Sequence, residues 1–322
     1  MFFMQKLLSH EQTGILPVIN IPHASLAVPL AEALRRGGLN SIEVTLRSPD
    51  SLESIRSIKA AFPDMNVGAG TVLTASIADQ AISCGADFLV SPGFEDAVVD
   101  HCIKKNTPIV PGCVTASEIQ KALKSGFKVV KFFPAEKNGS IEAIQLLSGP
   151  FPEVKFIPTG GIHFGNLGKY LACKHVLACG GSYMAPKERI LSRDFDAITL
   201  ACKQAVDLSL GFSLAHVGIN CSNHSEAAGC AETLSDIFRM APQYLNNAVF
   251  AGTAVEAIKS GGFGTHGHIG FYTHSISRAM EWFEAIGIPV EKDSFQYNSN
   301  GEITCVYLKN QVGGFALHVV ER

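Results

Sequence analysis

The chain of 322 residues is longer than a typical domain, and a barrel of about 200–250 residues followed by a smaller domain fits its length. A hydrophobic fraction of 47% with a charged fraction of 17% is typical of a globular protein with a large core, and it excludes a disordered chain. The net charge of −3 gives no electrostatic reason to expect nucleic acid or a membrane surface as a partner.

The beginning of the chain, MFFMQKLLSH, has no basic segment, no long apolar segment and no small-residue cleavage site, so it does not predict a signal peptide. No run approaches the roughly 18 consecutive apolar residues that a membrane-spanning helix needs. The nine cysteines are scattered and form no Cys-x-x-Cys pair, which indicates a reducing, cytoplasmic location.

Between residue 15 and about residue 210, short apolar runs alternate with amphipathic segments. The runs that predict strands are 15–20, 41–47, 66–72, 87–93, 108–113, 129–134, 155–161 and 175–182. The segments that predict helices are 25–38, 51–62, 76–86, 95–105, 115–126, 140–149, 166–172 and 194–208. Eight alternating pairs favour an α/β fold of the closed (β/α)8 TIM barrel type over residues 1–212. An open doubly wound sheet would alternate in the same way, but the first run leads into NIPHAS and not into a GxGxxG loop.

After residue 212 the pattern changes. Two segments share the layout His-aliphatic-Gly, then a polar break, then an amphipathic helix, and they begin at His216 and His268. The second copy continues into three strand-like runs, 288–298, 301–310 and 313–321, whereas residues 252–267 leave the first copy little room for three strands. We therefore expect residues 213–322 to form a smaller α+β domain of duplicated βαβββ type, with an abbreviated first copy.

Barrel enzymes place their chemistry at the carboxyl ends of the strands. Strand alternation puts Glu43, Thr45 and Arg47 on one face, and it puts Lys131 and Phe133 on one face of another strand. If Lys131 points inward among apolar side chains, burial favours the neutral amine, which is what Schiff-base formation with a ketone needs. Glu43 then suits the transfer of protons. The alternative is a buried ion pair between Lys131 and Glu43 without any reaction.

Arg47 suits bidentate binding of a substrate carboxylate, although pairing with an acid at a helix end is the alternative. Paired glycines in PTGGI and ACGGS end the seventh and eighth strands, where barrels often bind phosphate through backbone N–H groups. Turn glycines without a ligand are the alternative there.

The motifs IEVTLR, VGAGTV, SPG, VPGCVTASE, KFFPAE, PTGGI and GGS, in this order over residues 5–210, resemble those of the bacterial 2-keto-3-deoxy-6-phosphogluconate (KDPG) aldolases, a family that also acts on 2-keto-4-hydroxyglutarate (KHG). The resemblance implies a class I aldolase that cleaves KDPG to pyruvate and glyceraldehyde 3-phosphate, or KHG to pyruvate and glyoxylate, through a lysine Schiff base. It also implies a cytoplasmic homotrimer of the Entner–Doudoroff pathway whose partner is a small 2-keto acid and which needs no metal or other cofactor.

Carried over residue by residue, the resemblance implies that Lys131 forms the Schiff base and that Glu43 accepts the proton. It implies contacts of Arg47 and Thr71 with the pyruvyl carboxylate, and a pocket shaped by Pro92 and Phe133. It further implies that the substrate phosphate is bound by Thr159, Gly160, Gly161, Gly181 and Ser182. One departure is Cys113, where family members more often carry a small or polar residue.

The second domain resembles the vicinal oxygen chelate superfamily, to which glyoxalase I belongs. Members often bind a divalent metal through a His on the first strand and a Glu on the last strand of each module. His216 and His268 match the first-strand positions, and Glu256 and His318 fall near the last-strand positions, with His318 replacing the expected Glu. Because the first copy is abbreviated, we place no metal among the expected site residues and favour a module for oligomer contacts or regulation.

Two other functions remain open on the residues alone. A phosphate-binding barrel isomerase or epimerase would use Glu43 as a base without a covalent intermediate, and a degenerate barrel would serve as a ligand sensor. The intact set of Glu43, Arg47 and Lys131 argues against the sensor, because such a protein has little reason to keep a buried charge.

Overall fold

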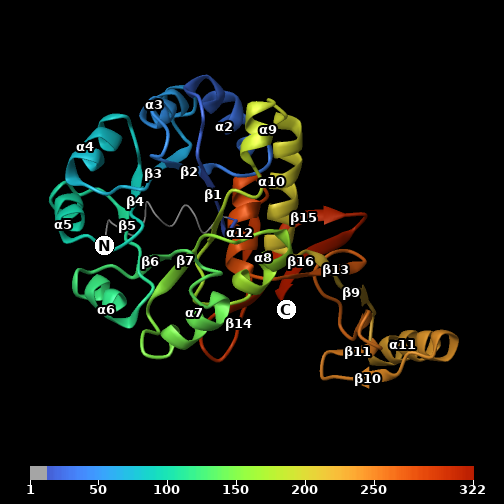
Figure 1. The fold of residues 1–322 in the computed structure, drawn as a ribbon. Coiled ribbons are helices and arrows are strands. Elements are labelled where there is room, and N and C mark those ends of the chain that lie inside the picture. The colour runs from blue at the N-terminus through green and yellow to red at the C-terminus, as the bar shows by residue number, and fades with distance from the viewer. Residues whose placement is uncertain (1–12) are drawn as a thin grey trace. The chain divides into compact units, whose positions relative to one another are not determined.

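The computed structural model describes residues 13–322, so the prediction about a signal peptide falls on residues outside the described ones. The chain divides into two compact units, and the division falls between Ser209 and Leu210 (Figure 1). The carboxyl-terminal unit therefore begins close to residue 213, where the sequence pattern changes.

From residue 13 onward the first unit contains eight strands, and every pairing between them is parallel. They are β1 (Ile15–Ile19), β2 (Ser41–Thr45), β3 (Asn66–Gly70), β4 (Phe88–Val90), β5 (Ile109–Val110), β6 (Val129–Phe132), β7 (Lys155–Pro158) and β8 (Cys179–Gly181). The first five strands pair in sequence order, and β8 pairs with β1. The bridges Gly112–Lys131 and Thr159–Gly180 join the β6–β7 pair to its neighbours, so the ring closes. The prediction of a closed barrel, in preference to an open sheet, is confirmed.

Helices follow the strands and surround the ring (Figure 1). They are α2 (Ala27–Arg36), α3 (Ser51–Ala61), α4 (Ala75–Ser83), α5 (Asp96–Lys104), α6 (Ala116–Lys124), α7 (Ser140–Ser148), α8 (Phe164–Leu171), α9 (Lys187–Leu191) and α10 (Phe195–Leu210), with a short 3-10 turn at Ala24–Leu26. The caps follow the sequence: Thr74 accepts a hydrogen bond from the Ile77 N–H, and Thr115 forms a reciprocal capping box with Glu118.

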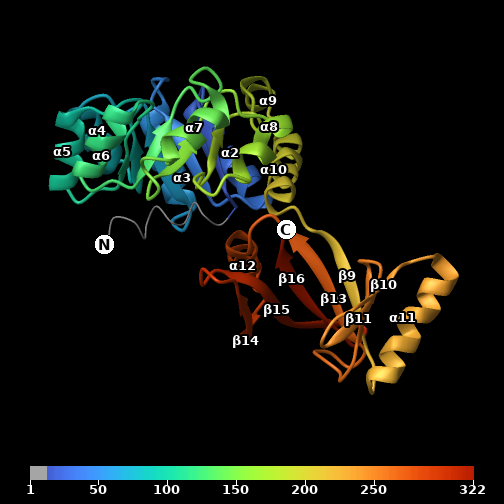
Figure 2. The same cartoon turned by 90° about the horizontal axis from the view of Figure 1, so that it is seen from below.

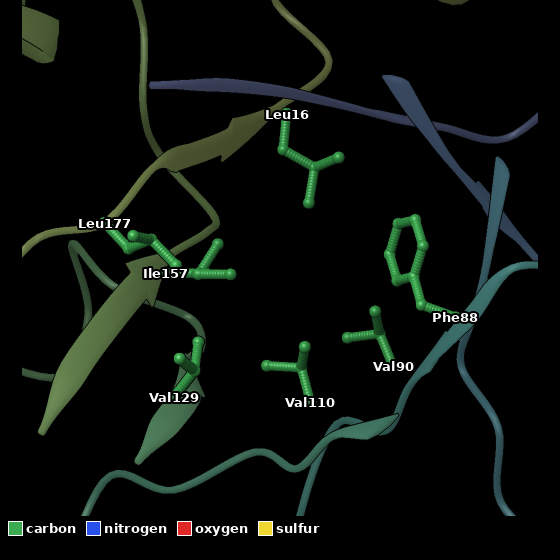
Figure 3. Packing of buried hydrophobic residues seen from close by; sticks show 7 residues of the cluster. All are labelled: Leu16, Phe88, Val90, Val110, Val129, Ile157 and Leu177. Atoms are coloured by element: carbon green, nitrogen blue, oxygen red, sulfur yellow. The ribbon is translucent and has the colours of Figure 1, made fainter. Parts of the chain in front are cut away.

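The interior of the barrel is a packed core in which side chains from different strands meet (Figure 3). Its buried members are Leu16, Phe88, Val90, Val110, Val129, Ile157 and Leu177. Val129 lies two residues before Lys131 on β6, and alternate residues of a strand share a face. Lys131 therefore also points into the barrel, one layer nearer the carboxyl ends of the strands.

The second unit is one sheet of eight strands, ordered β10-β11-β12-β9-β13-β16-β15-β14 (Figure 2). A strand, a helix and three further strands follow one another twice: β9 (Ser213–Asn220), α11 (His224–Phe238), β10 (Pro242–Tyr244), β11 (Ala248–Ala251) and β12 (Val255–Ile258), then β13 (Gly267–Thr273), α12 (Ile276–Ala285), β14 (Val290–Tyr297), β15 (Ile303–Val312) and β16 (Phe315–Glu321). The last three strands of the first copy span only 3 to 4 residues each, so that copy is short but has all three. The antiparallel pair β9–β13 joins the two copies.

The cysteines are all free thiols within residues 13–322. The Sγ atoms of Cys221 and Cys230 approach to 4.0 Å. Among the described helices, none combines the length and the apolar character needed to cross a bilayer.

Candidate functional sites

The first candidate site is built around a buried pair of charged side chains inside the barrel. Lys131 Nζ on β6 lies 2.9 Å from Oε1 and 3.3 Å from Oε2 of Glu43 on β2. The two residues are 7% and 1% exposed. Because β2 and β6 are on opposite sides of the eight-stranded ring, the two long side chains meet across its interior. The ion pair of the alternative interpretation is thus present, and the same geometry lets the carboxylate exchange a proton with the amine.

Gly70 on β3, which is not among the residues predicted from the sequence, makes room for the Glu43 carboxylate. A Cβ at this position would overlap Glu43 Oε1 and lie 2.8 Å from its Cγ and Cδ. Gly70 has an ordinary negative backbone φ, so space is the reason for glycine here. The available signal was a glycine inside the strand-like motif VGAGTV, since strand glycines often mark close approaches.

If Glu43 transfers protons as the sequence predicts, replacing Gly70 with alanine is expected to lower kcat/KM on the order of 100-fold, because misplacing a reacting group by about 1 Å costs that much. The methyl group would push the Glu43 carboxylate away from Lys131. Gly168→Ala in α8 is the matched control, since nothing lies within 4 Å of a Cβ there. Steady-state kinetics with both variants checks the prediction, and equal rates would contradict it.

Phe133 and the turn after β7 border the lysine. Lys131 Nζ lies 5.5 Å from the centroid of the Phe133 ring, and a Cβ on Gly160 would come within 3.2 Å of that ring. Gly160 and Gly161 have φ values of 93° and 87°, a conformation that only glycine adopts readily. The turn thus requires both glycines for its backbone, whether or not a ligand binds to it.

Arg47 and Thr71 form a second group at the same end of the barrel. Arg47 is exposed, and its Nε donates a hydrogen bond of 3.3 Å to Thr71 Oγ1. The expectation that Arg47 continues the second strand is wrong: β2 ends at Thr45, and Arg47 lies in the following turn. Thr71 has φ of +64°, which is rare for a β-branched residue and clusters at functional sites. Thr71 directly follows Gly70, so this group adjoins the Glu43 carboxylate.

The remaining predicted residues follow the ends of other strands. Pro92 comes two residues after β4, and its carbonyl would collide with a Cβ on Gly112. Gly181 is buried at the end of β8, and Ser182 is exposed. The bridge between Thr159 and Gly180 places the carboxyl ends of β7 and β8 side by side. The predicted residues therefore all lie at the carboxyl end of the ring. The closest contacts among them link Lys131 with Glu43 and with Phe133, and Phe133 with Gly160.

Cys113, the noted departure, is buried after β5. Its N–H donates a hydrogen bond of 2.9 Å to the Lys131 carbonyl, so its backbone lies beside β6. Burial, and to a smaller extent Glu118, raises the pKa of the thiol to about 12. Cys113 is thus a neutral, apolar part of the barrel wall at neutral pH.

The second candidate site is a cluster of three histidines and one glutamate in the second unit. His216 Nε2 on β9 lies 2.9 Å from His268 Nε2 on β13 and 3.3 Å from His318 Nε2 on β16. Glu256 Oε2 on β12 lies 3.1 Å from His268 Nε2 and 3.5 Å from His216 Nε2. These four residues are the ones that the sequence places near the first and last strands of each copy, and the fold brings them together.

The surroundings favour the neutral imidazole at His216 and His318. Burial lowers the pKa of His216, with His268 adding to the effect and Glu256 opposing it. Burial, with contributions from His268 and His216, lowers the pKa of His318 to about 3. The Nδ1 atom of His318 lies 3.3 Å from Cys305 Sγ, which directs its Nε2 toward the cluster. Neutral imidazoles have lone pairs that a cation can use.

Comparisons with known proteins match the first unit. The model of the KDPG and KHG aldolase family matches residues 8–201. The 2-dehydro-3-deoxy-phosphogluconate aldolase of Treponema pallidum is 45% identical over 198 residues, which cover 62% of this chain and 94% of the relative. The KHG/KDPG aldolase of Escherichia coli is 40% identical over 193 residues, covering 60% of this chain and 91% of the relative.

Two solved structures are also similar. A KDPG aldolase from Legionella pneumophila, with pyruvate captured as a covalent carbinolamine intermediate, aligns with a TM-score of 0.59 and 38% identity over 60% of this chain and 94% of its own. The enzyme of Zymomonas mobilis with 3-phosphoglycerate aligns with a TM-score of 0.60 and 37% identity over 64% of this chain and 95% of its own.

Proposed function

The chain belongs to the KDPG and KHG aldolase family, and from that membership we propose that Lys131 is its Schiff-base lysine and Glu43 its proton-transfer group. The substrate proposed is a 4-hydroxy-2-keto acid, either KDPG or KHG, cleaved reversibly to pyruvate and an aldehyde. The observation that carries the proposal is the buried contact of 2.9 Å between the amine and the carboxylate.

The roles follow from the chemistry of imines. The Lys131 amine adds to the C2 ketone, Glu43 relays the protons, and water leaves as the iminium forms. Glu43 then accepts the proton of the C4 hydroxyl, the C3–C4 bond breaks, and its electrons enter the iminium to give an enamine with release of the aldehyde. Protonation of the enamine at C3 and hydrolysis of the imine release pyruvate and regenerate the amine.

The other predicted residues are proposed to hold the two ends of the substrate. Arg47 and Thr71 offer a guanidinium and a hydroxyl to the carboxylate next to the ketone. Pro92 and Phe133 border the reacting carbons. The distal phosphate or carboxylate lies against Thr159, Gly160, Gly161, Gly181 and Ser182, where backbone N–H groups and a hydroxyl are available at the ends of β7 and β8.

Borohydride reduction in the presence of pyruvate tests this proposal. The expected result is a reduced pyruvyl adduct on Lys131, located by peptide mass spectrometry. Lys128→Ala, which removes an exposed lysine near the start of the same strand, should leave the adduct unchanged. A folded protein without any adduct would favour the isomerase or epimerase, which needs no imine.

The homotrimer and the cytoplasmic location remain proposals supported by the family resemblance and by the free cysteines. Light scattering after size exclusion checks the first, and cell fractionation checks the second. A monomer with full activity would contradict a trimer requirement.

A second function is proposed for the second unit: binding of a divalent first-row transition ion by His216, Glu256, His268 and His318. The convergence of the three histidines, with Glu256 Oε2 3.1 Å from His268 Nε2, favours it over a module without a ligand. Three imidazole nitrogens and one carboxylate oxygen form a donor set that suits Zn²⁺, Ni²⁺ or Co²⁺ better than Mg²⁺ or Ca²⁺. Such an ion, when bound, would supply Lewis acidity. The four residues themselves would hold it, and Cys305 would keep His318 oriented toward it.

Metal removal and return test this second function. After dialysis against a chelator, the full chain is expected to take up about one Zn²⁺ or Ni²⁺ per molecule, measured by mass spectrometry of the metal. The double variant H216A/H268A should take up none, whereas His224→Ala, at an exposed position on α11, should behave like the wild type. Equal uptake by the double variant and the wild type would contradict the proposal.

A further inference from the structure

The four side chains of the second candidate site come from two neighbouring rows of the sheet, and the register gives both rows the same pattern. In the first row, Gly218 on β9 pairs with Glu256 on one side and with His268 on the other. In the second row, Gly270 on β13 pairs with His216 on one side and with His318 on the other. In each row, a glycine therefore lies between two ligand residues on three adjacent strands.

The glycines leave open the space in which the ligand atoms meet. A Cβ on Gly270 would lie 2.5 Å from His318 Nε2 and 2.8 Å from His216 Cε1. A Cβ on Gly218 would lie 2.5 Å from His268 Nε2. Real Cβ atoms do not approach other atoms so closely, so either substitution forces a ligand to move.

The backbone does not require glycine at these two positions. Neither Gly218 nor Gly270 has a positive φ, and both lie within strands. Glycine in a strand interior is unfavourable for stability, because it adds chain entropy to the unfolded state and packs no side chain. Glycine occupies these two positions because the flanking ligand side chains fill the space that a Cβ would need.

The duplicated His-x-Gly segment creates both rows at once. Because β9 and β13 run antiparallel, the pairing of His216 with Gly270 also pairs Gly218 with His268. A slip of one residue would turn the ligands to the other face of the sheet.

We propose that Gly218 and Gly270 are positioning residues that reserve the volume of the bound ion between the two rows. This inference rests on the second proposed function, that the cluster binds a transition ion. The two glycines touch no ion themselves; they act by letting side chains from strands on either side reach a common point.

The test compares Gly270→Ala and Gly218→Ala with Gly229→Ala in α11, where nothing lies within 4 Å of an added Cβ. Zn²⁺ affinity of the full chain is measured by competition with a chromophoric chelator, and the Co²⁺ absorption spectrum reports the ligand geometry. Each of the first two variants is expected to bind Zn²⁺ on the order of 10–100-fold more weakly, as for other changes that disturb ligand orientation. The Gly229 variant should match the wild type in both measurements.

The fold of the second unit is followed through Trp282, the only tryptophan of the chain, which packs against the core of that unit. If Gly270→Ala loses the native fluorescence, the double variant G270A/H318A shows whether the steric clash is the cause. It removes the imidazole that lies nearest to the added Cβ. It should regain the fluorescence and bind Zn²⁺ no better than His318→Ala alone. Continued loss of the fold would overturn the inference.

The possible failures are distinguishable. If the wild type binds neither Zn²⁺ nor Ni²⁺, the second proposed function fails and the inference fails with it. If the wild type binds and both glycine variants bind equally well with an unchanged Co²⁺ spectrum, only the inference fails.

Discussion

Replacing Lys131 with alanine is expected to lower kcat/KM for aldol cleavage by on the order of 10⁴-fold or more, because no amine remains to form the imine. Without the iminium, the electrons of the breaking C3–C4 bond have no sink. Pyruvate release in a coupled assay measures the loss, and borohydride trapping should yield no adduct.

Lys131→Ala has a second consequence that must be separated from the first. It leaves the Glu43 carboxylate buried without its partner, and breaking a buried ion pair in this way destabilises a protein by about 3–5 kcal/mol. The double variant K131M/E43Q replaces the pair by two neutral side chains of similar size. It should recover most of that stability in thermal unfolding but none of the activity. Near-normal turnover by either variant would contradict the Schiff-base role and leave the pair a structural one.

The barrel and the direction of Lys131 could be predicted from local sequence. Short apolar runs separated by capped helices leave few arrangements, and eight such βα units match the number in a closed barrel. Alternation along β6 ties Lys131 to Val129, which has to face the core. The position of Arg47 could not be obtained in this way. Alternation presumes that the strand continues, and β2 ends at Thr45.

The role of the glycines inside strands could not be predicted from the local sequence. Gly70, Gly218 and Gly270 have ordinary backbone angles, so no turn signal distinguishes them. Each is needed because a side chain from an adjacent strand occupies the space in front of it. Which strand is adjacent, and in which register, follows from the pairing of segments far apart in the chain. The meeting of Glu256 with His268 depends on the same long-range pairing.

Replacing Glu43 with glutamine is the second large effect expected, a loss of 10²–10⁴-fold in turnover, which is the usual contribution of a general acid–base group. Glutamine fills the same space in front of Gly70 but cannot accept a proton. Lys131 keeps its place on β6, so borohydride should still trap pyruvate on it. The variant thus separates formation of the imine from proton transfer at carbon.

Exchange of the pyruvate methyl protons with deuterium from heavy water measures that proton transfer directly, without any aldehyde. NMR should show exchange by the wild type, and the Glu43→Gln variant should retain the adduct while exchange slows in parallel with turnover. If exchange continues at the wild-type rate, the Glu43 carboxylate is only the ion-pair partner of Lys131, and another group moves the proton. Gly70→Ala then discriminates further: it displaces the carboxylate without changing its chemistry, so its exchange rate should fall only if the position of Glu43 matters.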